Sequence, residues 1–283
     1  MVKVFKTKKE VRSCLGSLQP RERKIGLVPT MGALHKGHLE LVARALAEND
    51  LVVVSIFVNP TQFNNTDDLH KYPKTLEQDL ELLRGLSKDI LVFAPEVSEM
   101  YDSGVASRSY NFDGLEKVME GTFRPGHFNG VGTIVEELLT LIQPDRAYFG
   151  EKDFQQLQII RKLVAKKNIP VEIIGCPIVR ESNGLALSSR NARLPERVRK
   201  EAAFIYTTLK AAKAKFGTKS AGYVVDWVRK QFLAHPDLEL EYVEITEVNT
   251  LTPVLRKKKD QKYRAFIAAY ANGVRLIDNI ALN

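Results

Sequence analysis

The stretch IGLVPTMGALHKGHLELVARALAE, residues 25–48, decides the fold. Its first residues, 25–28, are mostly apolar and predict a short buried strand, which residues 29–32 end. From Gly37 onward the apolar residues recur at helical spacing and predict an amphipathic helix. Main-chain N–H groups and the positive end of the helix dipole then point at one spot between the two elements. The stretch therefore predicts a nucleotide-binding α/β domain.

Two histidines, His35 and His38, lie at this junction. Residues at this spacing face the same side of a helix start, and Gly32 and Gly37 let a ligand approach the main chain closely. Without a helix-borne glutamate between them, the two histidines make a poor zinc pair. A metal pair and ordinary turn histidines remain as alternatives. The arrangement suits a triphosphate but does not name a reaction.

Composition narrows the class of partner. The chain has 283 residues, which is enough for two domains, and 44% of them are apolar. A net charge of +8 favours anionic partners. The basic residues are scattered, and the densest run, residues 256–259, is typical of a solvated turn. Because no basic groove interleaved with aromatic residues is visible, small anions explain the charge better than nucleic acid does.

The sequence also bears on the compartment. No apolar run reaches transmembrane length, and the basic N-terminal residues lack the long apolar core of a secretory signal. Cys14 and Cys176 lie far apart, a usage typical of reduced cytosolic proteins. We therefore expect a cytoplasmic protein that does not bind membranes.

Strands alternate with helices through the first part of the chain. Residues 1–24 predict an amphipathic helix and a loop. The β-branched run 51–57 predicts a parallel strand buried on both faces, with further strands at 90–93, 145–149 and 171–174. Helices are predicted at 75–86, 133–142 and 154–167. This alternation indicates an α/β fold with a doubly wound, Rossmann-like parallel sheet, in which ligands bind at the carboxyl ends of the strands.

The pattern changes after Pro195. Helices are predicted at 196–216 and 220–233, followed by strands at 238–248 and 265–271. Helices followed by strands, without βαβ alternation, predict a smaller α+β domain. We place the boundary near residue 177, giving a nucleotide-binding domain of residues 1–176 and a C-terminal domain of residues 177–283.

Three further segments carry groups that suit anions. Residues 121–132 are rich in glycine and include Arg124 and His127, although a simple connector is the alternative. Lys152 lies between a predicted strand and a helix. Ser188, Ser189 and Arg190 place two hydroxyls before a guanidinium, with a plain linker as the alternative. The polar stretch 64–74 predicts a lid.

Taken together, six segments resemble the pantothenate synthetase (pantoate–β-alanine ligase) family of the HxGH nucleotidyltransferase superfamily. They are PTMGALHKGH (29–38), VNPTQF (58–63), YPKT (72–75), RPGHF (124–128), GEKDFQQ (150–156) and LALSSRN (185–191). They follow the family's order. Family members commonly have methionine where Leu187 stands, a change between side chains of similar volume.

The resemblance implies ATP-dependent condensation of (R)-pantoate with β-alanine through pantoyl adenylate, releasing AMP and diphosphate, with Mg²⁺ and a homodimer. It implies catalytic roles for His35, His38, Lys152 and Arg190, with His38 as a proton donor. It places pantoate against Gln62 and Gln156, and β-alanine against Gln62. The metal ligands are unknown. The implied ATP site comprises Met31, Gly32, Ala33, Leu34, His35, Lys36, Gly37, His38, Gly150, Glu151, Lys152, Asp153, Val179, Leu187, Ser188, Ser189 and Arg190.

Two alternatives stay open on the residues alone. A cytidylyl- or adenylyltransferase would transfer a nucleotide onto a phosphate, and such an acceptor would favour Arg or Lys at the positions of Gln62 and Gln156. A non-catalytic RNA-binding module would need an aromatic platform and a concentrated basic surface. Its binding to RNA would weaken steeply with salt.

Overall fold

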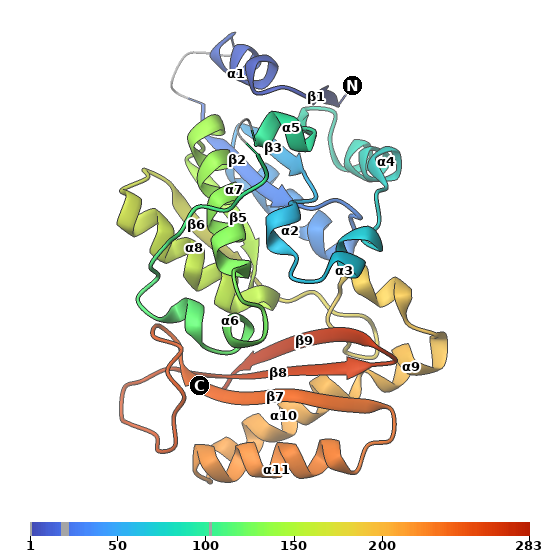
Figure 1. The fold of residues 1–283 in the computed structure, drawn as a ribbon, viewed down its shortest axis with the longest axis vertical. Coiled ribbons are helices and arrows are strands. Elements are labelled where there is room, and N and C mark those ends of the chain that lie inside the picture. The colour runs from blue at the N-terminus through green and yellow to red at the C-terminus, as the bar shows by residue number, and fades with distance from the viewer. Residues whose placement is uncertain (1, 18–22, 102–103) are drawn as a thin grey trace. The chain divides into compact units, whose positions relative to one another are not determined.

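A computed structural model describes residues 2–17, 23–101 and 104–283 (Figure 1). The chain divides into two compact units. The first unit comprises Met1–Glu151 and Gln156–Pro177, and the second comprises Lys152–Gln155 and Ile178–Asn283. None of the described helices is both long and apolar enough to cross a membrane.

Among the described residues, six parallel strands form the sheet of the first unit. Its order is β1 (Lys3–Phe5), β4 (Ile90–Phe93), β3 (Leu51–Ile56), β2 (Ile25–Thr30), β5 (Arg146–Gly150) and β6 (Glu172–Cys176). The inner residues of β3 and all of β4 are buried, as expected for runs that are apolar except for Ser55. The predicted doubly wound parallel sheet is confirmed.

Helices cover both faces of this sheet (Figure 1). They are α1 (Lys8–Ser17), α2 (Lys36–Glu48), α4 (Leu76–Leu86), α7 (His127–Ile142) and α8 (Phe154–Lys167). From β2 the strand order continues to β3 and β4 on one side and to β5 and β6 on the other. Because parallel crossovers are right-handed, the two directions place α2 and α4 on one face and α1, α7 and α8 on the other.

The point where the strand order reverses lies between β2 and β5. These strands pair only through Gly26–Arg146 and Leu27–Ala147, whereas β2 pairs with β3 along its whole length from Ile25 to Thr30. In the described residues, no pairing therefore joins the carboxyl ends of β2 and β5. Open α/β sheets bind ligands in the crevice at this position.

Short elements complete the first unit, and two features of this unit correct the sequence-based prediction. The shorter helices are η1 (Pro60–Gln62), α3 (Thr66–His70), α5 (Val97–Met100), η2 (Leu115–Lys117), α6 (Glu120–Phe123) and η3 (Glu151–Asp153), of which η3 begins in the first unit and continues into the second. Strand β1 was not predicted, because its three residues include an exposed lysine and pair only at the sheet edge. Part of the predicted loop, residues 18–22, lies outside the described residues.

Helix α7 begins at His127, so the glycine-rich segment is not a loop as predicted. Gly130 and Gly132 lie inside the helix. A Cβ at Gly130 would lie 2.2 Å from the carbonyl oxygen of Thr61, and one at Gly132 would lie 3.0 Å from the Tyr110 ring. These glycines are therefore explained by close packing of α7 and not by a ligand.

The second unit packs two helices on an antiparallel sheet (Figure 1). Its elements are η4 (Ser189–Arg193), α9 (Glu196–Glu201), α10 (Phe204–Phe216), α11 (Ala221–Leu233), β7 (Leu238–Glu247), β8 (Tyr263–Ala271) and β9 (Val274–Ala281). The strand order is β7-β8-β9, and α10 and α11 contact the sheet. The smaller α+β fold is confirmed, but the helix predicted over 196–216 is two helices, and β9 was missed.

Candidate active site

The turn that follows β2 is built around a buried carboxylate. Gly32 and Ala33 both have positive φ, at 78° and 51°. Asp79, on α4, accepts hydrogen bonds from the N–H groups of Ala33 at 3.0 Å and Leu34 at 2.7 Å, and from the Thr75 hydroxyl at 3.2 Å. Burial raises the pKa of Asp79 above its ordinary value, and the hydrogen bonds it accepts oppose that rise. Sequence analysis gave Asp79 no role.

His35 and His38 form a reciprocal cap at the start of α2. The Nδ1 atom of His35 accepts from the N–H of Gly37 at 3.1 Å, and Nδ1 of His38 accepts from the N–H of His35 at 3.4 Å. The two ring centroids lie 4.1 Å apart. Because Nδ1 accepts in both rings, each neutral imidazole carries its proton on Nε2. The cap therefore fixes the tautomer and the ring orientation of both histidines.

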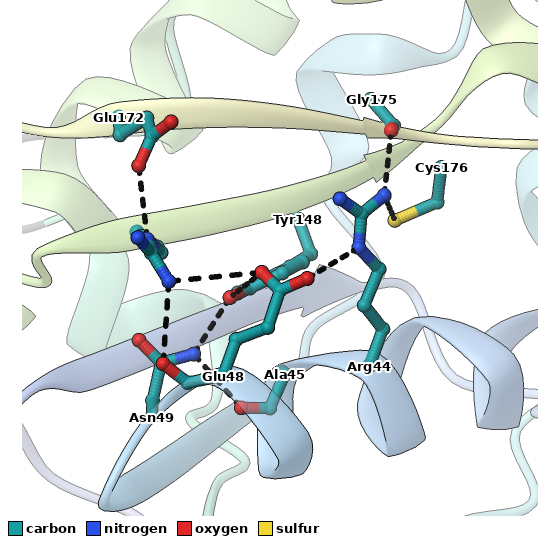
Figure 2. Close-up of polar contacts among 9 residues, drawn as sticks. Arg44, Ala45, Glu48, Asn49, Tyr148, Glu172, Gly175 and Cys176 are labelled. Atoms are coloured by element: carbon teal, nitrogen blue, oxygen red, sulfur yellow. Dashed lines mark hydrogen bonds and ion pairs between the residues drawn. The ribbon is translucent and has the colours of Figure 1, made fainter.

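Hydrogen bonds join the C-terminal end of α2 to the sheet (Figure 2). Arg44 donates to the carbonyl oxygen of Gly175 at 3.0 Å and to the Glu48 carboxylate at 2.8 Å. Glu48 also accepts from the Tyr148 hydroxyl at 2.9 Å, and Asn49 donates to that hydroxyl at 2.7 Å. These bonds join α2 to β5 and β6. They hold the helix whose first turn carries His38.

Gln62 follows β3, next to the end of β2, and its amide has a defined orientation. Asn59, which is fully buried, donates to Gln62 Oε1 at 3.0 Å and to the carbonyl oxygen of Gly130 at 3.1 Å. Its own Oδ1 accepts from the hydroxyls of Thr61 at 3.1 Å and Tyr101 at 2.5 Å. Asn59 therefore fixes the orientation of the Gln62 amide, with its oxygen toward Asn59.

Two residues of the RPGHF segment hold the main chain of the same loop. His127 Nδ1 lies 2.8 Å from the carbonyl oxygen of Gln62, and Arg124 donates to that oxygen at 3.1 Å. Arg124 also lies 3.2 Å from His127 Nε2 and 3.6 Å from the Glu120 carboxylate. The guanidinium that sequence analysis assigned to anions is thus occupied in shaping the Gln62 loop.

The second unit holds the other predicted phosphate-binding groups. Lys152 is partly buried, and its Nζ lies 3.8 Å from the Asp153 carboxylate. Leu187 N–H donates to Val179 O at 3.0 Å, which brings these two predicted ATP residues together in a hairpin. The Ser188 hydroxyl accepts from the N–H of Arg190 at 3.3 Å and caps η4.

The predicted residues therefore fall into two sets, one in each unit. The first unit carries Met31–His38, Gln62 and Glu151 after strands of the sheet, Gly150 as the last residue of β5, and Gln156 in the first turn of α8. The second unit carries Lys152, Asp153, Val179 and Leu187–Arg190. Asn59 and Asp79, which sequence analysis did not single out, organise the first set. Lys36 alone of the 31–38 group is exposed.

Comparison with known proteins shows the family of the chain. The family model described as pantoate-beta-alanine ligase matches residues 3–281. The chain belongs to the pantoate–β-alanine ligase family. The match includes both units, so the predicted family and ligase class are confirmed.

Relatives in the pantoate–β-alanine ligase family align over the whole chain. A pantothenate synthetase of Christiangramia forsetii is 56% identical over 282 residues, covering 100% of both chains. The crystal structure of pantothenate synthetase from Thermus thermophilus superposes with a TM-score of 0.91 at 43% identity, covering 99% of each chain. The pantoate–β-alanine ligase of Francisella tularensis, a complex with beta-gamma ATP and β-alanine, gives a TM-score of 0.81 at 36% identity, covering 100% of this chain and 98% of that one.

Proposed function

We propose that the chain condenses (R)-pantoate with β-alanine in an ATP-dependent reaction that forms pantothenate, AMP and diphosphate. Pantoyl adenylate is the intermediate. Membership of the ligase family supports the overall reaction. The observation that carries the proposal at the level of residues is the reciprocal cap of His35 and His38, in which the Nδ1 atom of each ring accepts a main-chain hydrogen bond at the start of α2.

The first step is a displacement at the α-phosphorus of ATP by the pantoate carboxylate. A carboxylate with a pKa of about 4 is already ionised at neutral pH, so no general base is needed. The difficulty is charge, because an anion approaches a polyanion and the leaving diphosphate gains negative charge. Catalysis then depends on donors and cations directed at phosphate oxygens. His35, His38 and Lys152 supply them, together with the segment Ser188–Arg190.

The second step joins the amine to the acyl carbon. The β-alanine nitrogen attacks the pantoyl carbonyl, AMP leaves, and the C–N bond of pantothenate forms. Gln62 and Gln156 bind pantoate in this proposal, since amides can hydrogen-bond its hydroxyls without adding charge. Gln62 also contacts β-alanine. The orientation that Asn59 gives to Gln62 supports a substrate oxygen at the Gln62 NH₂ group.

A divalent cation, Mg²⁺, enters with the nucleotide in this proposal. In the part of the chain that the structure describes, no group of three or more His, Cys, Asp or Glu side chains could hold a metal ion. Mg²⁺ commonly keeps several waters and binds mainly through substrate phosphates, a mode that needs no cage of protein ligands. When bound there, it supplies neutralising charge to the phosphate oxygens.

We also propose a homodimer and a cytoplasmic location, on the basis of the family resemblance. Both cysteines are free thiols, which suits a reducing compartment. Sedimentation of the purified chain tests the dimer, and fractionation of cells tests the location.

Incubation with ATP, Mg²⁺, pantoate and β-alanine tests the proposed reaction. Mass analysis should find pantothenate and AMP in equal amounts, and no pantothenate when any one substrate is omitted. Formation of ADP, or of a nucleotidylated phosphate ester from a phosphorylated acceptor, would contradict the proposal.

A further inference from the structure

The segment that carries Lys152 is held by strand β9. Asn279, on β9, is 2% exposed, and its side-chain NH₂ donates to the main-chain carbonyl oxygen of Lys152 at 2.8 Å. The same amide accepts, through Oδ1, a hydrogen bond from the guanidinium of Arg264 on β8. Because Arg264 can only donate, the orientation of the Asn279 amide is fixed with its NH₂ group toward Lys152.

Arg264 contacts this segment a second time. Its guanidinium carbon lies 3.9 Å from the centroid of the Phe154 ring, and the Phe154 and Phe266 ring centroids are 6.1 Å apart. Phe154 is 5% exposed, so its ring is anchored among side chains of the second unit. Lys152 is thus held through its own carbonyl oxygen and through the ring of a residue two positions later.

The neighbour of Asn279 holds the second phosphate-binding segment. Asp278 is 4% exposed and accepts two hydrogen bonds from Arg180, at 2.6 and 2.9 Å. The Tyr206 ring stacks on the Arg180 guanidinium, 3.6 Å from its central carbon. Arg180 also pairs with Ala186 across the hairpin that leads to Ser188, and η4 contacts β9.

We propose that the consecutive residues Asp278 and Asn279 are positioning residues that together hold the second unit's two phosphate-binding segments in place. Asn279 fixes Lys152, Asp278 fixes the hairpin before Ser188–Arg190, and the main-chain N–H of Asn279 donates to Asp278 Oδ1 at 2.7 Å and joins the two. This proposal rests on the proposed function of Lys152 and deepens it. Neither residue takes part in the chemistry. Their effect is confined to the step in which a triphosphate rearranges.

Asn279→Asp is the sharpest test, because it keeps the shape and the acceptor for Arg264 but replaces the donor to Lys152 with an oxygen. We expect pantoate-dependent exchange of labelled pyrophosphate into ATP to fall by about ten- to a hundredfold in turnover, the effect of a small misplacement of a reacting group. Turnover of supplied pantoyl adenylate with β-alanine should change less than about threefold, because no triphosphate rearranges in that step. Hydrogen exchange of the 152–155 amides should rise about tenfold.

Asn283→Asp is the matched control. Asn283 also donates from its side chain to a carbonyl oxygen of the second unit, that of Gln261 at 2.7 Å, and its Oδ1 also accepts a hydrogen bond. This variant should leave both half-reactions and the 152–155 amides unchanged. If Asn279→Asp folds poorly, Asn279→Ala provides the same comparison without a new charge.

The outcomes separate this inference from the proposed function. Unchanged hydrogen exchange at residues 152–155 in Asn279→Asp overturns the inference, whatever the activity. Equal loss in both half-reactions also overturns it, because that result indicates a general structural role. Absence of pantoate-dependent exchange in the wild-type chain would instead contradict the proposed function, while the hydrogen-exchange comparison would still decide whether Asn279 holds Lys152.

Discussion

The Asp79 carboxylate accepts a 2.7 Å hydrogen bond from the main-chain N–H of Leu34, and this bond shapes the turn that leads into His35. The bond joins α4 to the turn after β2, across 45 residues of sequence. It holds a turn in which Gly32 and Ala33 have positive φ. The direction of His35 and His38 therefore depends on a side chain from another helix.

Asp79→Asn should reduce the first half-reaction. The amide replaces one acceptor oxygen with an NH₂ group that opposes a main-chain N–H, so the turn loses one of its two fixed bonds. A displacement of this kind lowers turnover by about ten- to a hundredfold. Pyrophosphate exchange measures the effect. Asp89→Asn, at an exposed position before β4, is the control, and equal activities of the two variants would contradict the role of Asp79.

The same substitution has a defined effect on the pH dependence of stability. Burial raises the pKa of Asp79 above its ordinary 3.8. Between that value and the raised one, the folded state binds more protons than the unfolded state, so the contribution of Asp79 to the free energy of unfolding falls as pH rises through this interval. The side-chain amide of the variant does not titrate. Urea unfolding measures the free energy of unfolding of the wild-type chain minus that of Asp79→Asn. This difference should decline as pH rises between the ordinary and the raised pKa, and should be constant at higher pH. A difference that increases with pH in this interval would contradict the raised pKa of Asp79.

Asn59→Asp should impair the use of pantoate and spare ATP. The carboxylate keeps the bonds from Thr61 and Tyr101 but cannot donate to Gln62 or Gly130. Loss of a buried donor costs about 1–3 kcal/mol, which corresponds to a rise of about 5- to 150-fold in KM for pantoate. The KM for ATP should change less than about threefold. Asn65→Asp keeps the acceptor that caps α3 and serves as the control; a larger effect on ATP than on pantoate would refute the assignment of Gln62.

Gly130→Ala should destabilise the first unit, although alanine favours helices. The added Cβ would lie 2.2 Å from the carbonyl oxygen of Thr61, and overpacking of this kind costs about 1–3 kcal/mol. Gly85→Ala on α4 meets nothing within 4 Å and should stabilise by about 0.5–1 kcal/mol. Thermal unfolding compares the pair. If Gly130→Ala is as stable as the wild-type chain, the close contact between α7 and the Gln62 loop is incorrect.

The sequence predicted those parts of the fold that depend on the pattern of residues within one short segment. The strand at Ile25–Thr30 and the run from Leu51 are continuous apolar segments, and the helix after His35 has a clear apolar face. β9 was missed because the polar pair at 278 and 279 interrupts its apolar pattern. The turn before it, Asn272-Gly273, has φ values of 48° and 72°, and an Asn-Gly pair between apolar runs is a hairpin pattern that could have revealed the strand.

Only the motif residues of the candidate site could be predicted from the sequence. Positions such as His38 and Lys152 are identified by the neighbouring residues of the motifs that contain them. Asp79 and Asn279 act on residues 46 and 127 positions away, at Ala33 and Lys152, and no local pattern marks such contacts. The same holds for Gly130, whose role depends on the approach of a loop from β3. Residues that hold a site in place become visible only in the folded chain.

Exchange of labelled pyrophosphate into ATP shows whether the chain activates a carboxylate as an adenylate. If a carboxylate is activated as an adenylate, exchange requires pantoate and proceeds without β-alanine, because the amine acts only on the intermediate. His38→Ala and Lys152→Ala should lower it by about two to four orders of magnitude. Exchange that strictly requires β-alanine, or that a phosphorylated acceptor supports in place of pantoate, would contradict the account.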